Sequence, residues 1–252
     1  MRVNGLTVRR FASPASAARA LARDMARALT LNPRLVLGLP TGRTPVPLYA
    51  ELIELCGRGA VDLSRATTFN LDEFLGLAST DQRSYRAFMQ RHLFGHIDLP
   101  AHRIHFLDGA APDPHAECDR YERQIARVGG LDLLLLGLGT NGHIGFNEPG
   151  QSLVSATHST RLTAVTRRAN APLFGNRAAA VPGHALSMGM GTILRARRIV
   201  LLATGTSKAA AVRRLVHGPI TPAVPASFLQ LHRSAEIWVD EAAGARLSGR
   251  AT

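Results

Sequence analysis

Short apolar runs alternate with segments of helical periodicity along almost the whole chain, and this alternation limits the folds open to it. The runs are nearly continuous in apolar or β-branched residues, as strands buried on both faces should be. Such alternation predicts a mostly parallel sheet with helices on both faces. We therefore expect an α/β fold: a three-layer, open, Rossmann-like sheet in a single domain over residues 1–252.

The expected elements can be placed from these patterns and from local capping signals. Ser13 and Pro14, for example, form the N-cap and first-turn proline of a helix. The predicted strands are residues 35–39, 67–70, 104–107, 131–136, 199–203 and 236–239. The predicted helices are residues 15–29, 45–56, 85–94, 114–128, 189–195 and 207–217.

Composition excludes several classes of protein. No apolar run approaches the roughly 20 residues needed to cross a bilayer, and the first residues lack the apolar core of a secretory signal. Two cysteines, Cys56 and Cys118, provide neither a disulfide framework nor a paired metal-binding spacing. We expect a cytoplasmic protein with no membrane partner and no metal site.

The cationic side chains are numerous but scattered. The 30 lysines and arginines exceed the 18 acidic residues by 12, yet no basic run reaches five residues, and aromatic residues make up only 5% of the chain. Nucleic-acid binders concentrate their charge and use aromatic rings for stacking, so we expect no nucleic-acid partner. Lys208 is the single lysine beside 29 arginines.

Ligands of open α/β sheets bind beyond the carboxyl ends of the strands. The first such loop contains Thr41, Gly42, Arg43 and Thr44 and precedes a helix. Its backbone N–H groups are suited to an anion, although an ordinary tight turn with a helix cap would look the same. The loop after residues 67–70 places Asp72 beside Glu73, a pair that indicates either a helix cap, which is the commoner case, or a general base.

The densest loop follows the most apolar run and combines glycines with polar side chains. Four of the nine residues from 137 to 145 are glycine, including Gly137 and Gly145, and such residues permit close approach of a ligand. Asn141, His143 and Glu148 lie between and after them. An imidazole exchanges protons near neutral pH, so the loop predicts acid–base chemistry, with the amide and the carboxylate orienting the ring.

A fourth loop contains Lys208 at the start of a predicted helix, after a Gly-Thr-Ser turn. A cation at a helix N-terminus opposes the helix dipole. A bound anion would offset that cost, so Lys208 is a candidate phosphate ligand.

Together these loops resemble the glucosamine-6-phosphate deaminase (glucosamine/galactosamine-6-phosphate isomerase) family. The resemblance extends from residue 35 to about residue 239 and is most specific in the His-Ile-Gly-Phe-Asn-Glu-Pro run at residues 143–149. Residues 37–45, 69–77 and 205–208 match further family motifs in the same order. The related 6-phosphogluconolactonases lack the Phe-Asn-Glu-Pro continuation.

The resemblance implies a reaction and roles for the candidate residues. An amino-sugar phosphate would bind as the cyclic form, and His143 would open the ring. Asp72 would move a proton from C2 to C1, giving a ketose phosphate and ammonia. The loop from Thr41 to Thr44 and Lys208 would hold the phosphate, and no metal or redox cofactor is implied.

Three departures from the family pattern affect these expectations. Asn141 replaces a frequent aspartate and orients His143 without adding negative charge. Pro172 occupies the position of a phosphate-binding arginine in a segment, residues 160–185, that the resemblance implies is a mobile lid. Arg43 stands where glycine is common, and we hypothesise that it replaces the missing cation. The alternative is a changed substrate.

The residues leave other functions open. A lactonase-type hydrolase would need a water-activating site, and a non-catalytic sugar-phosphate sensor would carry a helix-turn-helix domain for which we see no room before Ser13. Galactosamine 6-phosphate differs from the glucosamine compound only at C4. Formation of a homo-oligomer stays open, and we expect no activation by N-acetylglucosamine 6-phosphate because residues 156–161 are mostly not basic.

Overall fold

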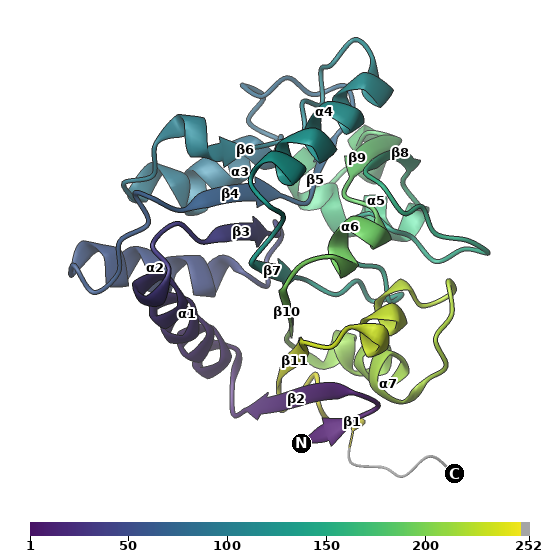
Figure 1. Cartoon of the computed structure of the whole chain (residues 1–252). Helices are drawn as coiled ribbons and strands as arrows, with labels where there is room; N and C mark the ends of the chain where they lie inside the picture. Colours follow the sequence, from purple (N-terminus) through teal and green to yellow (C-terminus); the bar gives the residue numbers. More distant parts are fainter. Residues whose placement is uncertain (248–252) are drawn as a thin grey trace.

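A mostly parallel sheet forms the centre of the protein (Figure 1). The computed structural model describes residues 1–247, so the last part of the predicted domain, residues 248–252, lies outside the described residues. The strand order is β1-β2-β11-β10-β7-β3-β4-β6, and all its pairings are parallel except that of β1 with β2. The strands are β1 Arg2–Val3, β2 Leu6–Phe11, β3 Val36–Leu39, β4 Thr67–Asn70, β6 Ile104–His105, β7 Leu133–Leu136, β10 Arg198–Ala203 and β11 Ala235–Asp240.

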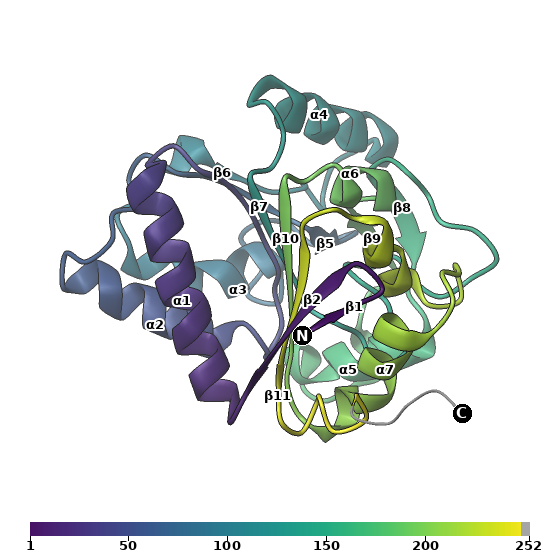
Figure 2. The ribbon, with the colours of Figure 1, turned by 60° about the horizontal axis from the view of Figure 1, so that its bottom comes forward.

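Helices cover both faces of this sheet (Figure 2). One face carries α1 Pro14–Leu31, α2 Val46–Gly57 and α3 Tyr85–His92, and the other carries α4 Pro114–Arg127, α6 Met190–Leu194 and α7 Ala209–His217. Alternate leucines of β7 belong to different cores: Leu133 and Leu135 pack with α1 and α2, whereas Leu134 and Leu136 pack with α4 and α7. The three-layer α/β fold is therefore confirmed, and it is explained by strands that are apolar on both faces.

Local capping explains where some helices begin. The Ser13 side chain accepts a hydrogen bond from the backbone N–H of Ser16, whose hydroxyl accepts one from the Ser13 N–H, and Pro14 occupies the first turn as predicted. The helix predicted from residue 207 begins instead at Ala209, because Thr206–Lys208 form a 3₁₀ turn, η5. The other 3₁₀ turns are η1 Phe94–His96, η2 Ala101–Arg103, η3 Ala171–Phe174, η4 Ala178–Ala180 and η6 Pro225–Leu231.

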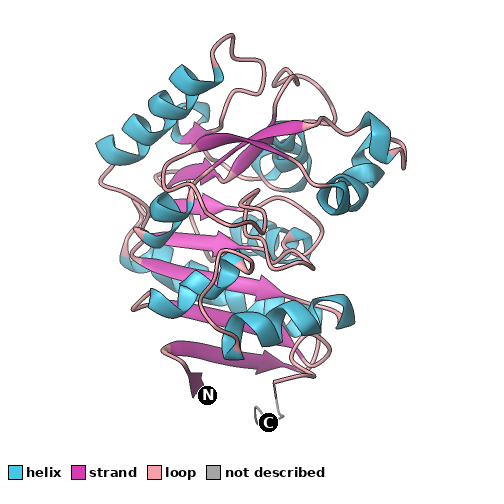
Figure 3. Cartoon of the chain, turned by 90° about the vertical axis from the view of Figure 1, so that its right-hand side faces the viewer, coloured by secondary structure: helices cyan, strands magenta, loops and turns pink. Residues whose placement is uncertain are grey.

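A second, smaller sheet was not predicted. It pairs β5 Asp72–Phe74 with β9 His184–Ser187, and β9 with β8 His158–Arg161, all antiparallel (Figure 3). The helix α5, Ala164–Asn170, lies in the connection between β8 and β9. These strands have three or four residues each, and β8 contains only polar residues, so no apolar run marks them.

The sequence analysis also missed β1 and β2 and made the strands predicted at residues 35–39, 131–136 and 104–107 too long. The first two are limited to Val36–Leu39 and Leu133–Leu136. The strand β2 contains Arg9 and Arg10, which interrupt its apolar pattern. The strand predicted at residues 104–107 is limited to Ile104–His105. Within residues 1–247, no helix has the length and apolar character needed to cross a membrane.

Candidate active site

A cavity of about 450 Å³ opens where β3, β4, β7 and β10 end, so the four loops singled out in the sequence meet at one edge of the sheet. Most of the predicted site residues line it: Thr41, Gly42, Arg43, Thr44, Asp72, Gly137, His143, Gly145 and Lys208. Asn141 and Glu148 do not line the cavity and lie behind His143.

Asp72 is held in the wall of the cavity by β5. Asp72 is only 6% exposed. This burial, reinforced by the negative charge of Glu73, raises the pKa of the Asp72 carboxyl to about 8. A carboxylate of raised pKa is a stronger base than an ordinary aspartate. The Gly145 backbone lies against it, because a Cβ there would be 3.7 Å from Asp72 Oδ2.

The neighbouring carboxylate has a different task. Glu73 is 2% exposed, and its oxygens accept hydrogen bonds from the backbone N–H groups of Phe74, Tyr85 and Arg86 at 2.9, 2.9 and 3.0 Å. It therefore caps the first turn of α3 from a distance in sequence. The sequence left a helix cap and a general base as alternatives for this pair. In the structure Glu73 is the cap, and Asp72 is the carboxylate that lines the cavity.

His143 faces the carboxylate of Glu148. Nδ1 of His143 lies 3.6 Å from Glu148 Oε2, an ion-pair separation slightly longer than a hydrogen bond. Burial opposes ionisation of Glu148, but the facing imidazole of His143, together with the hydroxyl of Thr166 and the amide of Asn141, lowers its pKa to about 2. Glu148 is thus a carboxylate at neutral pH and presents its negative charge to the imidazole of His143.

The side chain of Asn141 was expected to orient the His143 ring, but its hydrogen bonds go to Glu148 and to the loop backbone. Its Nδ2 donates to Glu148 Oε2 at 3.0 Å, and its Oδ1 accepts from the backbone N–H of His143 at 3.2 Å. The amide oxygen is used by the loop backbone, so Asn141 orients the imidazole through Glu148 and not by touching it.

Gly139 leaves the space that the imidazole occupies. A Cβ at this position would lie 2.4 Å from ring atoms of His143, whereas a Cβ on Gly137 would meet nothing within 4 Å. We expect Gly139→Ala to displace the ring and to lower the free energy of unfolding by about 1–3 kcal/mol, as overpacking does. Urea unfolding measures this, with Gly137→Ala as the control; equal stability of the two variants would contradict the predicted clash.

Two cations share the other side of the cavity. The pKa of Lys208 is lowered, first by burial and second by the positive charge of Arg43, so the two side chains are close enough to repel each other. Both line the cavity, and no salt bridge to either is found among residues 1–247. A pair of adjacent, uncompensated cations favours an anion between them.

The Lys208 loop is fixed by a buried carboxylate at the end of the neighbouring strand. The backbone N–H of Gly205 donates to both oxygens of Asp240, at 3.0 and 3.1 Å, and Asp240 is 3% exposed. Gly205 has φ of 87°, a left-handed conformation that glycine adopts without strain. The backbone of the loop that leads to Lys208 is therefore anchored to the end of β11.

The predicted site residues leave out one wall of the cavity, which lies within the segment 160–185 expected to be a lid. This wall is formed by α5 through Val165, Thr166, Ala169 and Asn170. Pro172 is exposed and does not line the cavity, so this side supplies no cation to it. Further lining residues outside the predicted set include Leu71, Tyr85, Phe146, Thr204 and Ser207. Thr204 precedes the Gly-Thr-Ser turn and Ser207 is its last residue, but no pattern in the sequence marks Tyr85 or α5.

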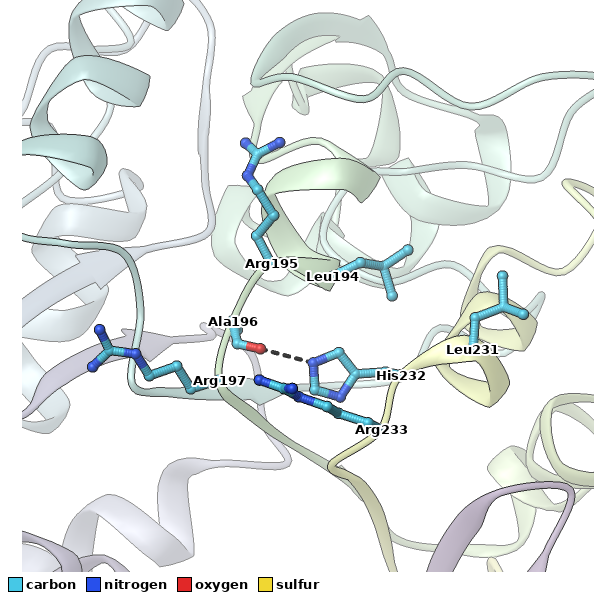
Figure 4. Close-up of a pocket in the computed structure, with 7 residues that line it drawn as sticks. All are labelled: Leu194, Arg195, Ala196, Arg197, Leu231, His232 and Arg233. Atoms are coloured by element: carbon cyan, nitrogen blue, oxygen red, sulfur yellow. Dashed lines mark hydrogen bonds between the residues drawn. The ribbon is translucent and has the colours of Figure 1, made fainter.

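A second cavity, of about 370 Å³, lies at the opposite edge of the sheet, where β10 and β11 begin. Figure 4 shows the guanidinium groups of Arg195 and Arg197 directed away from each other and from His232. Arg195 pairs with Glu122 and Arg197 with Asp132, while both ring nitrogens of His232 contact backbone groups. These side chains do not converge on a ligand, so the catalytic candidates lie in the first cavity.

No group of three or more His, Cys, Asp or Glu side chains within residues 1–247 is arranged to hold a metal ion. The first cavity itself presents a buried carboxylate, an imidazole with a carboxylate behind it, and two cations. These groups suit proton transfer on an anionic substrate.

The chain is similar in sequence and in structure to known proteins of one family. The sequence profile of the family described as glucosamine-6-phosphate isomerases/6-phosphogluconolactonase matches residues 10–238. A glucosamine-6-phosphate deaminase of Shewanella woodyi is 49% identical over 88% of this chain and 84% of its own length. The solved structure of a monomeric glucosamine-6-phosphate deaminase is 42% identical, with a TM-score of 0.92 over 96% of this chain and 100% of that one.

More distant structures share the fold alone. The 6-phosphogluconolactonase of Trypanosoma brucei is 20% identical, with a TM-score of 0.76 over 96% of this chain and 99% of that one. The match of the family profile to most of the chain, together with the identity to the deaminases, confirms the resemblance seen in the sequence. The chain belongs to the family of glucosamine-6-phosphate isomerases and 6-phosphogluconolactonases.

Proposed function

We propose that this protein is a glucosamine-6-phosphate deaminase, which converts glucosamine 6-phosphate and water to fructose 6-phosphate and ammonia. The observation that carries the proposal is one cavity lined by Asp72 with a raised pKa, by His143 backed by Glu148, and by the Arg43–Lys208 cation pair. Relatives at 42–49% identity over most of the chain that are named as this deaminase support it.

The residues take roles that follow from their surroundings. His143 moves a proton from the sugar's C1 hydroxyl to its ring oxygen, which opens the ring, and Glu148 stabilises the imidazolium that forms. Asp72 then takes the C2 proton and returns it at C1, so the open-chain aldose becomes the C2 imine of a ketose. Water adds at C2 of this imine and the nitrogen leaves as ammonia, which gives the ketose phosphate. Arg43, Lys208 and the loop from Thr41 to Thr44 hold the phosphate and position the reacting carbons. This scheme uses no metal or redox cofactor.

We also propose that residues 160–185 form a lid over this cavity. Within it, Arg167 donates to the backbone oxygens of Val181 at 3.2 Å and Ala179 at 3.0 Å, so α5 and η4 would move together. The Tyr85 hydroxyl donates to Asn170 Oδ1 at 2.8 Å and would hold the lid against α3. An exposed Val165 at the mouth suits a segment that closes on a ligand.

The proposed setting is the breakdown of amino sugars in the cytoplasm. The reaction consumes water and releases ammonia, so in that sense the enzyme acts as a hydrolase. The related solved structure is of a monomeric deaminase, and light scattering of this protein would decide between a monomer and a homo-oligomer.

The decisive assay measures ammonia and ketose phosphate released from glucosamine 6-phosphate. Unphosphorylated glucosamine, galactosamine 6-phosphate and 6-phosphogluconolactone serve as parallel substrates. We expect turnover of glucosamine 6-phosphate, much slower turnover without the phosphate, and no change when N-acetylglucosamine 6-phosphate is added. Release of ammonia from the galactosamine compound alone, or hydrolysis of the lactone alone, would contradict the proposal.

A further inference from the structure

The carboxylate of Glu148 connects two parts of the site. Its Oε2 receives the amide of Asn141 and faces Nδ1 of His143. Its Oε1 accepts hydrogen bonds from the hydroxyl of Thr163, the N-cap of α5, at 3.2 Å and from that of Thr166 in the first turn of the helix. Oε2 of Glu148 thus contacts the loop that carries the imidazole, and Oε1 contacts the helix that forms a wall of the cavity.

The link to α5 is buried and therefore strong. Thr166 is 1% exposed, and the side chain of Glu148 is 9% exposed, so water cannot readily replace the hydroxyl if it is lost. Hydrogen bonds to a charged group in such surroundings contribute more than exposed neutral ones. Thr163 has a second task as the N-cap of α5, where its hydroxyl accepts from the Thr166 N–H at 3.2 Å. The Thr166 hydroxyl accepts from the Thr163 hydroxyl at 3.3 Å and donates its own proton to Glu148, so Thr166 is the donor committed to that carboxylate.

The same helix faces the cavity. Val165, Ala169 and Asn170 line it from α5 on either side of Thr166 in sequence. A ligand that moves α5 therefore moves the Thr166 hydroxyl, and with it the carboxylate that faces His143. A rigid turn of helix transmits such a shift without any change in the catalytic loop itself.

We propose that Thr166 is a positioning residue that couples the place of α5 to the orientation of Glu148 and hence of His143. The inference rests on the proposed function in so far as His143 is the acid and base of that reaction. With the Thr166 hydroxyl absent, Oε1 of Glu148 keeps only the hydrogen bond from Thr163, at 3.2 Å, and the carboxylate turns away from the productive geometry. Substrate binding is unaffected, and the proton-transfer step slows.

The test compares Thr166→Val with a matched control, Thr192→Val. Thr192 is 2% exposed and donates its hydroxyl to Glu122 Oε1 at 2.5 Å, but it lies on α6 and does not line the cavity. We expect Thr166→Val to lower kcat about tenfold, a fraction of what a general acid–base residue contributes, with KM changed less than about twofold. Thr192→Val should keep the wild-type kcat. Thr166→Ser, which restores the hydroxyl, should recover most of the activity.

The ring nitrogens of His143 provide a readout that is independent of turnover. We expect their ¹⁵N resonances to shift in Thr166→Val and to stay in place in Thr192→Val. Unchanged resonances, an unchanged kcat, an effect on KM alone, or failure of Thr166→Ser to recover would each overturn the coupling. Should the wild-type protein release no ammonia from any amino-sugar phosphate, the proposed function fails, while the resonances still decide whether α5 controls the imidazole.

Discussion

Replacing Asp72 with Asn is expected to lower kcat for ammonia release by about 10³-fold while leaving the protein folded. The amide cannot accept the C2 proton, and general bases contribute about 10²–10⁴-fold to such reactions. Ammonia release and exchange of the C2 hydrogen in deuterated water both measure the loss. Asp62→Asn, which changes an exposed carboxylate away from the cavity, is the control and should keep the wild-type kcat. A Asp72→Asn variant retaining a tenth of the activity would remove Asp72 from the mechanism.

The same substitution is expected to stabilise the protein at high pH. Folding raises the pKa of Asp72 from 3.8 to about 8, so between these values the unfolded chain releases a proton that the folded protein keeps. The folded state is therefore increasingly disfavoured as pH rises through this window, and asparagine avoids that cost. At about 1.4 kcal/mol per pKa unit, the stability gain should be larger at pH 8 than at pH 5 by at most about 4 kcal/mol. Urea unfolding at the two pH values tests the sign.

The raised pKa also predicts the pH profile of the wild-type enzyme. Only the ionised Asp72 acts as a base, so kcat/KM should rise with pH and level off above about 8. If Asp72→Asn is more stable but inactive, and the wild-type enzyme shows this pH profile, then Asp72 is a base whose burial destabilises the folded protein but is kept for catalysis. Such a trade is typical of catalytic groups.

The central sheet and its ligand-binding edge could be predicted from sequence because their signals are local. A strand such as β7, Leu133–Leu136, is apolar on both faces, and the rule that ligands bind at carboxyl ends pointed to the loops after it and its neighbours. His143 and Lys208 were singled out in this way, because unusual residue types follow such runs. For Asp72 and Glu73 the pattern favoured a helix cap, and the role of Asp72 as a base came from the family resemblance.

No apolar run or helical periodicity marked β8 and α5, which lie in and beside the proposed lid. The strand β8 is polar and α5 has only seven residues, so neither has a periodicity long enough to register. Thr166 lies 18 residues beyond Glu148, and only the tertiary fold brings its hydroxyl to that carboxylate. The indirect role of Asn141 was equally hidden, because a sequence does not tell which partner an amide chooses.

Removing the guanidinium of Arg43 is expected to raise KM for glucosamine 6-phosphate by about 10- to 100-fold, with a smaller change in kcat. A hydrogen bond to a charged group contributes about 1.5–3 kcal/mol, and each 1.4 kcal/mol corresponds to a factor of ten. Steady-state kinetics of Arg43→Ala measure it. Arg213→Ala is the matched control because it removes the same charge from an exposed position on α7 outside the cavity, and its KM should stay within about twofold of wild type.

The dependence of KM on ionic strength tests whether Arg43 attracts the phosphate of the substrate. Because Arg43 is exposed, salt should weaken its attraction for the phosphate, and KM of the wild-type enzyme should rise with ionic strength. Arg43→Ala should show a shallower rise, since only the more buried Lys208 then faces the phosphate. A KM that hardly changes in Arg43→Ala would mean that Arg43 does not replace the cation missing at Pro172. The lid would then have to supply the phosphate contacts from another residue, and substrates with a different group at that end would become the better candidates.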